Sequence, residues 1–226
     1  MMNRQHCADQ EFARTILYQF LAMTFYEPAD NFLVELEQED SKKDLLEASR
    51  LLLEVKGVEL MQEILHTLDG VNNAGKLGHQ DLKAEYTRLF LGPMSPACPP
   101  YESYFDTNRP QEFQGTLMGP SSEAMEIALA EEGLELTLDY AELSDHVAIE
   151  LEFMYYLLSR AYAEEKDSDV YLKKANAFFM EHLFPWLPKF GAKLSKESRH
   201  PFYKGIGLLL ESTVKIDLGS VVNQKH

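Results

Sequence analysis

Apolar residues recur every three or four positions along most of this chain, and this spacing is typical of one face of an α-helix. Stripes of this kind begin near Glu11, Lys42, Leu82, Ser121, Ser144, Val170 and Phe202. The alternating pattern of a strand occurs only at 134–138, where it is isolated. The pattern therefore predicts an all-α fold, a single bundle of about eight to ten helices.

Glycine, proline and small polar residues set the expected helix boundaries. Helices are expected to end at Pro28, Gly92 and Gly133, because proline cannot continue a helix and glycine favours its C-terminal turn. Hydroxyl and acidic residues at 121–123 and 144–145 are expected to start the helices that follow them. The same reasoning predicts a break at Gly57, a loop at 70–78 and a rigid corner at 185–188.

The segment 93–120 is the least regular part of the chain, because it carries six prolines and two glycines. Such a segment is typical of a long structured loop or of a hinge. We expect one domain over 1–226, with an N-terminal half at about 1–112 and a C-terminal half at about 113–226 that this proline-rich hinge joins.

Composition narrows the class of protein. The 226 residues are 45% hydrophobic, which is enough for a core, and carry a formal net charge of −16. Nucleic-acid binding and adsorption to anionic membranes need basic surface, so we expect neither. No apolar run reaches the roughly 18 residues of a membrane span. The first residues lack a secretory signal, so we expect a cytoplasmic protein that does not insert into membranes. An acidic surface instead attracts cations, metals or basic peptides.

The motifs of common enzymes are missing or badly placed. No glycine-rich phosphate loop is present in the sequence. Ser144, Asp145 and His146 are the residue types of a hydrolase triad, but contiguous residues point in different directions on a helix.

Candidate metal ligands are few. The pairs Glu63/His66 and Glu197/His200 have the Glu-x-x-His spacing of a di-metal site in a four-helix bundle, but the proline after the second pair disfavours helix there. We therefore expect no catalytic residue, no metal site and no cofactor. A helical metal- or nucleotide-binding enzyme is the alternative.

Three blocks of sequence carry a family resemblance. They are Glu-Tyr-x-Arg-Leu-Phe-x-Gly-Pro at 85–93, Pro-Pro-Tyr-Glu-Ser-Tyr at 99–104, and Asp-His-Val-x-x-Glu-Leu-x-Phe-Met at 145–154. With these blocks in this order, and with its length and acidity, the chain resembles the TorD/DmsD family of redox-enzyme maturation chaperones. The resemblance runs from about Glu11 to Leu210.

The resemblance implies an all-helical, TorD-like protein without catalytic activity. Family members bind the twin-arginine signal peptide of a molybdenum-cofactor oxidoreductase, such as a dimethyl sulfoxide or trimethylamine N-oxide reductase. They hold the apo catalytic subunit back from export until its cofactor is inserted. The implied partners are that signal peptide and the apo form of the molybdoenzyme. The resemblance also implies a monomer or a domain-swapped homodimer, and allows weak binding of GTP or molybdopterin guanine dinucleotide.

A signal peptide of this kind has a basic front and an apolar core, so its receptor needs an apolar groove and carboxylates. The residues expected to bind it lie in the three blocks or directly after the second one, and are Tyr86, Leu89, Phe90, Pro100, Tyr101, Glu102, Ser103, Tyr104, Phe105, Asp145, His146 and Glu150. Among these, Tyr101, Tyr104 and Asp145 are the expected direct contacts, and His146 is a candidate to titrate near neutral pH. Two alternatives stay open: Leu89 and Phe90 as core residues, and Asp145 as a helix N-cap. A generic acidic scaffold that recognises no signal peptide is a third possible function.

Overall fold

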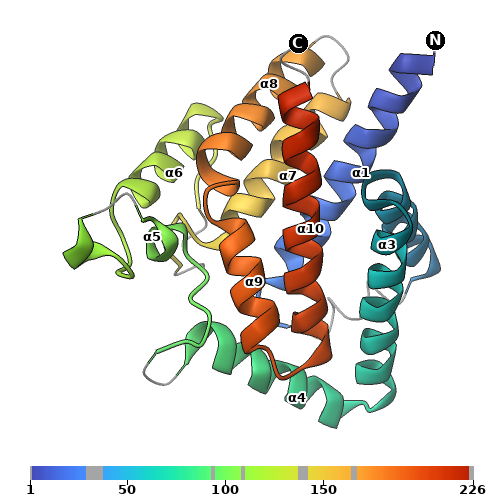
Figure 1. Cartoon of the computed structure of the whole chain (residues 1–226), viewed down its shortest axis with the longest axis vertical. Coiled ribbons are helices and arrows are strands. Elements are labelled where there is room, and N and C mark those ends of the chain that lie inside the picture. The colour runs from blue at the N-terminus through green and yellow to red at the C-terminus, as the bar shows by residue number, and fades with distance from the viewer. Residues whose placement is uncertain are drawn as a thin grey trace.

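The computed structural model describes residues 2–28, 38–92, 95–107, 110–136, 142–163 and 167–223. Within these ranges the chain forms nine α-helices and no strand, which confirms the predicted all-α fold. The helices are α1 (Met2–Thr24), α3 (Glu39–Asn73), α4 (Lys76–Tyr86), α5 (Glu102–Phe105), α6 (Pro120–Glu131), α7 (Val147–Ala163), α8 (Ser168–Phe178), α9 (Leu187–Glu197) and α10 (Pro201–Asn223) (Figure 1). Two π-helical turns, η1 (Thr87–Leu91) and η3 (Phe179–Leu183), continue α4 and α8, and a 3-10 turn, η2, spans Gln111–Phe113.

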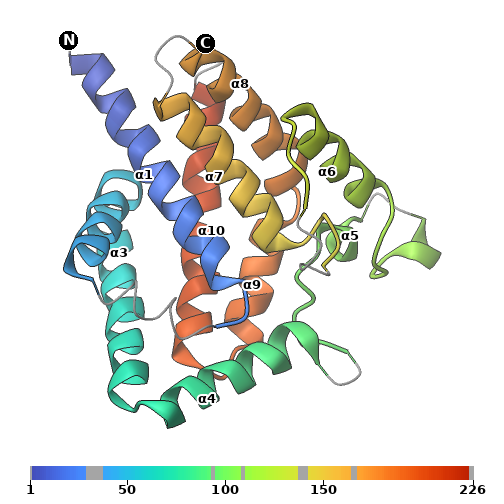
Figure 2. The same cartoon turned by 180° about the vertical axis from the view of Figure 1, so that it is seen from behind.

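The long helices form the body of the molecule. Helix α1 packs against α3 and α7, α10 packs against α3 and α9, and α8 covers α7. Figure 2 shows α1 running between α3 and α7, so that the N-terminal helix packs between helices that follow it in the sequence. A single cluster of buried apolar side chains contains residues of all these helices. None of the described helices has the length and apolar character needed to cross a membrane.

A buried ion pair joins α1 to α10. Arg14 Nε lies 2.7 Å from Asp217 Oδ1, and the two side chains are 2% and 0% exposed. The Tyr18 hydroxyl donates a hydrogen bond of 2.8 Å to the other carboxylate oxygen of Asp217. Because the charges are paired and hydrogen-bonded, they can be held inside the apolar bundle.

Two glycines let α9 and α10 approach each other closely. A Cβ atom on Gly207 would lie 2.6 Å from the carbonyl oxygen of Gly191 and 2.7 Å from the backbone nitrogen of Ser195. A Cβ atom on Gly191 would in turn lie 2.8 Å from the carbonyl oxygen of Gly207. The two backbones therefore occupy space that any other residue type would need for its side chain.

Two of the expected boundaries around α3 were wrong. The break in α3 falls at Glu54, with φ 59° and ψ −152°, and not at Gly57. Gly57 is instead a site of close approach, because a Cβ atom there would lie 2.1 Å from Leu53 Cβ. The loop expected at 70–78 is only a short turn, since α3 runs to Asn73 and α4 begins at Lys76.

Helix α9 was missed, because the corner expected at 185–188 is its beginning. Proline is favoured in the first turn of a helix, where its lack of an N–H group costs nothing, and α9 has a proline there. The buried residues of α9 are also at helical spacing: Leu187, Phe190, Gly191 and Leu194.

The segment expected to be a hinge contains regular structure, α5 and η2, although residues 93–94 and 108–109 lie outside the described residues. Of the alternating run at 134–138, residues 134–136 have no strand pairing and 137–138 also lie outside the described residues.

Candidate functional site

The three sequence blocks of the expected binding site meet in space. The backbone N–H of Cys98, directly before the second block, donates to the carbonyl oxygen of Leu89 at 2.8 Å, which ties this segment to the first block. The N–H of Val147 donates to the carbonyl oxygen of Pro100, also at 2.8 Å, which ties the third block to the second. Tyr101 and His146 form an isolated antiparallel bridge between these segments. The three blocks, 85–93, 99–104 and 145–154, therefore form one continuous region of the structure, which we call the corner.

Asp145 is a structural residue in this corner. Its side chain is 0% exposed. Its carboxylate accepts a hydrogen bond of 2.8 Å from the backbone N–H of Ser103 and one of 2.7 Å from the Ser122 hydroxyl. The acceptor positions of Asp145 thus hold the start of α5 and the start of α6. The expectation that this carboxylate lies at the edge of a groove and contacts peptide directly does not fit this burial.

His146 takes the capping role that was considered for Asp145. It precedes the first residue of α7, and its Nδ1 accepts a hydrogen bond of 3.1 Å from the backbone N–H of Ala148. The ring is 2% exposed and lies edge-on to Tyr101. Burial lowers the pKa of His146 to about 3, so the suggestion that it titrates near neutral pH is not supported.

Most residues of the first block belong to the core. Leu89 is 0% and Phe90 3% exposed. The Tyr86 hydroxyl donates to the carbonyl oxygen of Phe25 at 3.1 Å, and the ring packs edge-on against Phe90. The core alternative for Leu89 and Phe90 therefore describes their place in the structure.

The charged residues of the first block, Glu85 and Arg88, hydrogen-bond to each other and to the chain around the end of α9. Glu85 accepts a hydrogen bond of 2.7 Å from Arg88 Nε and one of 2.6 Å from the backbone N–H of Arg199. Arg88 also donates to the carbonyl oxygen of Glu197 at 2.7 Å. Burial alone would raise the pKa of Glu85, but these hydrogen bonds lower it to about 2. This pair fixes α4 to the connection between α9 and α10.

The second block offers the partly exposed rings. Tyr101, Tyr104 and Phe105 are half-buried, whereas Pro100 and Ser103 are buried. Phe105 packs against Trp186 and Phe190, with ring centroids 5.5 and 5.8 Å away. The Tyr101 hydroxyl donates to the Glu142 carboxylate. Of the residues expected to bind peptide, Tyr101, Tyr104 and Phe105 keep the accessibility that direct contact needs.

An apolar pocket lies beside this corner, and sequence reasoning missed it. Its volume is about 490 Å³, and Ile149, Phe153 and Tyr156 bring one face of α7 into it. Its other lining residues are Tyr26, Leu129, Leu134, Glu135, Leu136, Glu152, Tyr155 and Ser159. The Tyr26 hydroxyl donates to the Glu152 carboxylate, which places a carboxylate at an apolar surface. The spacing of the α7 residues, at i, i+4 and i+7, was visible but reads equally well as core.

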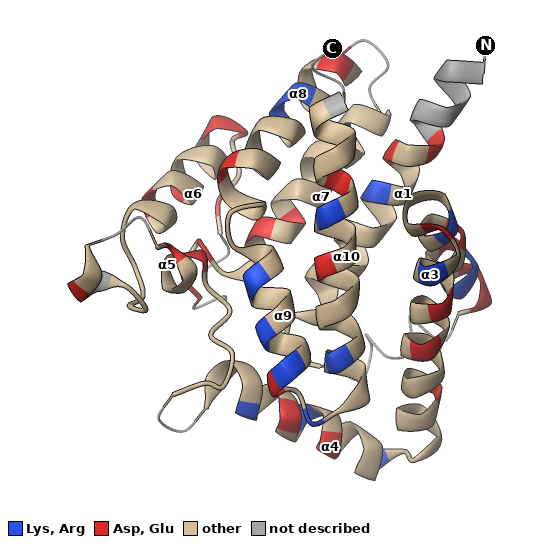
Figure 3. Ribbon diagram, in the orientation of Figure 1, with Lys and Arg blue, Asp and Glu red and all other residues tan. Residues whose placement is uncertain are grey.

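The pocket lies in the most acidic part of the chain. From residue 95 to residue 159 the sequence has thirteen Asp or Glu residues, one Arg and no Lys. Figure 3 shows acidic positions without basic ones on α6, whereas α9 carries Lys189, Lys193 and Lys196. This uneven distribution can be read from the sequence, whereas the total charge alone conceals it.

Glu102 and Glu150 face a third residue that the sequence did not suggest. His182 Nδ1 lies 3.1 Å from Glu102 Oε2, and Trp186 Nε1 donates to Glu150 Oε2 at 3.0 Å. Burial, and then the nearby charge of Glu102, raise the pKa of Glu150 well above its usual range. Like Asp145 and His146, these three residues are buried, so they lie beneath the surface of the corner.

The chain is similar to proteins of known family. The family model described as nitrate reductase delta subunit matches residues 53–192. The chaperone protein TorD of Vibrio parahaemolyticus serotype O3:K6 is 28% identical over 162 residues, which cover 71% of each chain. The chaperone protein TorD of Salmonella schwarzengrund is 26% identical over 222 residues, which cover 96% of this chain and 95% of the relative.

A solved structure shares the fold. It is a crystal structure described as that of a redox enzyme maturation protein from Archaeoglobus fulgidus, with a TM-score of 0.52 and 22% sequence identity. The match covers 89% of this chain and 93% of the other. At this identity the likeness bears on the fold alone.

Proposed function

This chain belongs to the nitrate reductase delta subunit and TorD family of redox-enzyme maturation chaperones, and we propose that the client segment it binds is the twin-arginine signal peptide of a molybdenum-cofactor oxidoreductase. The chaperone acts in the cytoplasm on the apo catalytic subunit, before cofactor insertion and export. The observation that carries this proposal is the apolar pocket of α7, set in a stretch of sequence with thirteen acidic residues and one basic residue.

The pocket suits the apolar core of such a peptide. Leu134, Leu136 and Ile149 offer aliphatic surface, and Phe153 and Tyr155 offer rings. Burying about 400 Å² of apolar peptide surface contributes roughly 10 kcal/mol. Ordering a disordered peptide costs at least about 2–5 kcal/mol of that. The remainder corresponds to about micromolar affinity, which permits later release to the export machinery.

Carboxylates near the pocket suit the two arginines. Glu135 and Glu152 line the pocket, and Glu142 lies beside Tyr101 at the corner. A guanidinium group can displace a tyrosine hydroxyl from a carboxylate, because it brings a full opposite charge and two parallel N–H donors, whereas the hydroxyl brings one neutral donor. We propose Tyr101 and Tyr104 as further contacts, with Pro100, Ser103, Asp145 and His146 as the framework that positions them. In this arrangement the buried Tyr86, Leu89 and Phe90, with the half-buried Phe105, form the core beneath these contacts.

Titration with a synthetic signal peptide tests the proposal. We expect a twin-arginine peptide with an apolar core to bind with micromolar affinity, and the same peptide with both arginines replaced by glutamine to bind at least about tenfold more weakly. Higher salt should weaken the first peptide and leave the second nearly unchanged, since salt screens charge pairs. Equal affinity for both peptides would leave only nonspecific apolar binding and would reject the proposal.

Paired variants locate the site. Leu136→Ser and Glu152→Gln should each weaken binding severalfold, because they remove apolar contact and charge from the pocket. Leu208→Ser on α10 and Glu59→Gln on α3 are the matched controls, since Leu136 and Leu208 are 36% and 41% exposed and Glu59 is exposed. If the controls weaken binding as much as the pocket variants do, the peptide binds elsewhere.

A further inference from the structure

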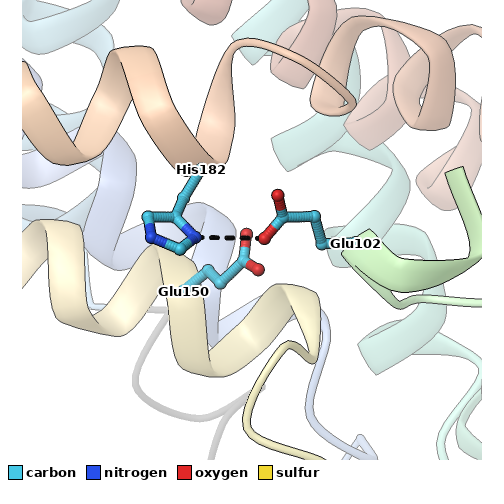
Figure 4. A group of neighbouring side chains, drawn as sticks. All are labelled: Glu102, Glu150 and His182. Carbon is cyan, nitrogen blue, oxygen red and sulfur yellow. Dashed lines mark hydrogen bonds and ion pairs between the residues drawn. The ribbon is translucent and has the colours of Figure 1, made fainter. Parts of the chain in front are cut away.

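Three metal-binding residue types converge from three separate elements. Glu102 is the first residue of α5, Glu150 lies in the first turn of α7, and His182 lies in η3. Each offers one ligand atom, and these atoms all lie within 4.8 Å of one another. Figure 4 shows the carboxylates of Glu102 and Glu150 and the imidazole of His182 turned toward a common point. The cluster stands independently of the proposed peptide site.

One ligand atom in this cluster accepts no hydrogen bond from a described donor. Glu150 is 0% exposed, and one of its carboxylate oxygens accepts the Trp186 hydrogen bond. Its other oxygen, Oε1, is buried and has no hydrogen-bond partner among the residues that the structure describes. A buried carboxylate oxygen without a partner is costly, so a structure that retains one requires an explanation. In the metal-free protein Glu150 can meet this cost only by sharing a proton with the neighbouring carboxylate of Glu102, and a metal ion would take the place of that proton.

A metal ion would satisfy this oxygen. We propose that Glu102, Glu150 and His182 bind a divalent first-row transition metal ion, with Mn²⁺ and Zn²⁺ as the probes. Metal–ligand bonds of roughly 2.0–2.2 Å can span the 3.1 Å between His182 Nδ1 and Glu102 Oε2. One imidazole and two carboxylates form a mixed donor set that favours these ions over Ca²⁺, which binds oxygen ligands only.

The position of the ion gives it a structural consequence. Glu102 belongs to the segment that carries Tyr101 and Tyr104, whereas Glu150 and His182 belong to the helical body. The ion would therefore fasten this segment to α7 and η3. The side chains of Glu102 and His182 are 12% and 11% exposed, whereas Glu150 is fully buried, so an ion would reach the site from the side of Glu102 and His182.

The chain contains its own reporter for this ion. It has a single tryptophan, Trp186, whose indole nitrogen lies 3.0 Å from a Glu150 oxygen. After chelator treatment and dialysis, we expect Mn²⁺ to quench the Trp186 fluorescence in a saturable way at one equivalent. Diamagnetic Zn²⁺ should compete with Mn²⁺ for the same site. Both ions should raise the thermal midpoint of the full chain, because they bind the folded state only.

Variants assign the ligands. Glu150→Gln and His182→Gln should each weaken Mn²⁺ binding by at least about tenfold, the smallest effect expected for a residue at a metal site. The matched control is Glu63→Gln/His66→Gln, which removes an exposed Glu-x-x-His pair on α3 and should leave the affinity unchanged. Circular dichroism checks that each variant is folded.

Two outcomes would overturn the site. One is the absence of saturable binding up to millimolar Mn²⁺ or Zn²⁺. The other is binding whose affinity is unchanged in both ligand variants, whatever the α3 control shows. If a ligand variant does not fold, anomalous diffraction from wild-type crystals soaked in Mn²⁺ decides instead. A peak between the three side chains supports the site, and peaks only at other positions reject it.

Discussion

Asp145 accepts a hydrogen bond of 2.8 Å from the backbone N–H of Ser103, across 42 residues of sequence. This bond, together with the one from Ser122, makes a single carboxylate the anchor of two helix starts. The third block, at 145–154, thus begins with a residue that supports the candidate site without reaching the surface.

Replacing Asp145 by alanine should destabilise the protein. The variant leaves the Ser103 N–H and the Ser122 hydroxyl buried without their acceptor, and losses of this kind cost about 2–4 kcal/mol in total. Urea denaturation measures the change. Asp81→Ala, at an exposed position on α4, is the control and should change the free energy of unfolding by less than about 0.5 kcal/mol. A stable Asp145→Ala protein with impaired peptide binding would instead return Asp145 to the contact surface.

Breaking the buried ion pair between α1 and α10 should have a larger effect. Arg14→Met leaves the Asp217 carboxylate buried with only the Tyr18 hydroxyl and no cation, and such a loss costs about 3–5 kcal/mol. The double variant Arg14→Met/Asp217→Leu should be more stable than Arg14→Met alone, because it removes the unpaired charge. Chemical denaturation of all three proteins checks the order, and a double variant that is less stable than the single one contradicts this account.

Acid should weaken the fold through His146. Burial lowers the pKa of its imidazole to about 3, well below the value near 6.5 in the unfolded chain. Between these two pKa values the imidazole is protonated in the unfolded chain and neutral in the folded one. The contribution is fully present above pH 6.5 and is lost as the pH falls toward 3, by about 2 kcal/mol between pH 6.5 and pH 5. His146→Asn retains an acceptor for the helix cap, so its free energy of unfolding should depend less steeply on pH over this range. An unchanged slope would mean that other groups cause the acid sensitivity.

Two glycines on α10 should respond in opposite ways to alanine. At Gly207 a Cβ atom would meet backbone atoms of α9 at 2.6 and 2.7 Å, so Gly207→Ala must separate the two helices and should cost about 1–3 kcal/mol or more. At Gly219 a Cβ atom meets nothing within 4 Å, and alanine there should stabilise the helix by about 0.5–1 kcal/mol. Thermal unfolding of the two variants tests the contrast, which equal changes of the same sign would refute.

The sequence predicted the helices better than their ends. A spacing of three or four residues identified the long helices, because each buries one face. The turns were harder to predict. The break in α3 was expected at Gly57 but lies at Glu54, and Gly57 is instead needed where its backbone packs closely against Leu53. Helix α9 was missed because proline was read as a corner, although proline is also common at a helix start.

The candidate site was predicted as a place and less well as a set of roles. The three blocks do meet, but residue type alone cannot say whether a carboxylate such as Asp145 faces solvent or a backbone N–H. The convergence of His182 on Glu102 could not be predicted, because 80 residues separate them and no local pattern links them. The α7 pocket depends on how α6 and its following loop lie on one helix face, which is a property of tertiary packing.

The ion pair between Arg14 and Asp217 can form only after the chain has been synthesised as far as α10. Its partners are 203 residues apart, and ribosomes add about 5–20 residues each second, so the first helix waits roughly 10–40 s for its counterpart to be synthesised. During that interval the apolar face of α1 has no α10 to cover it. A nascent maturation factor of this design is therefore, for a short time, itself a candidate for assistance by the general folding machinery of the cell.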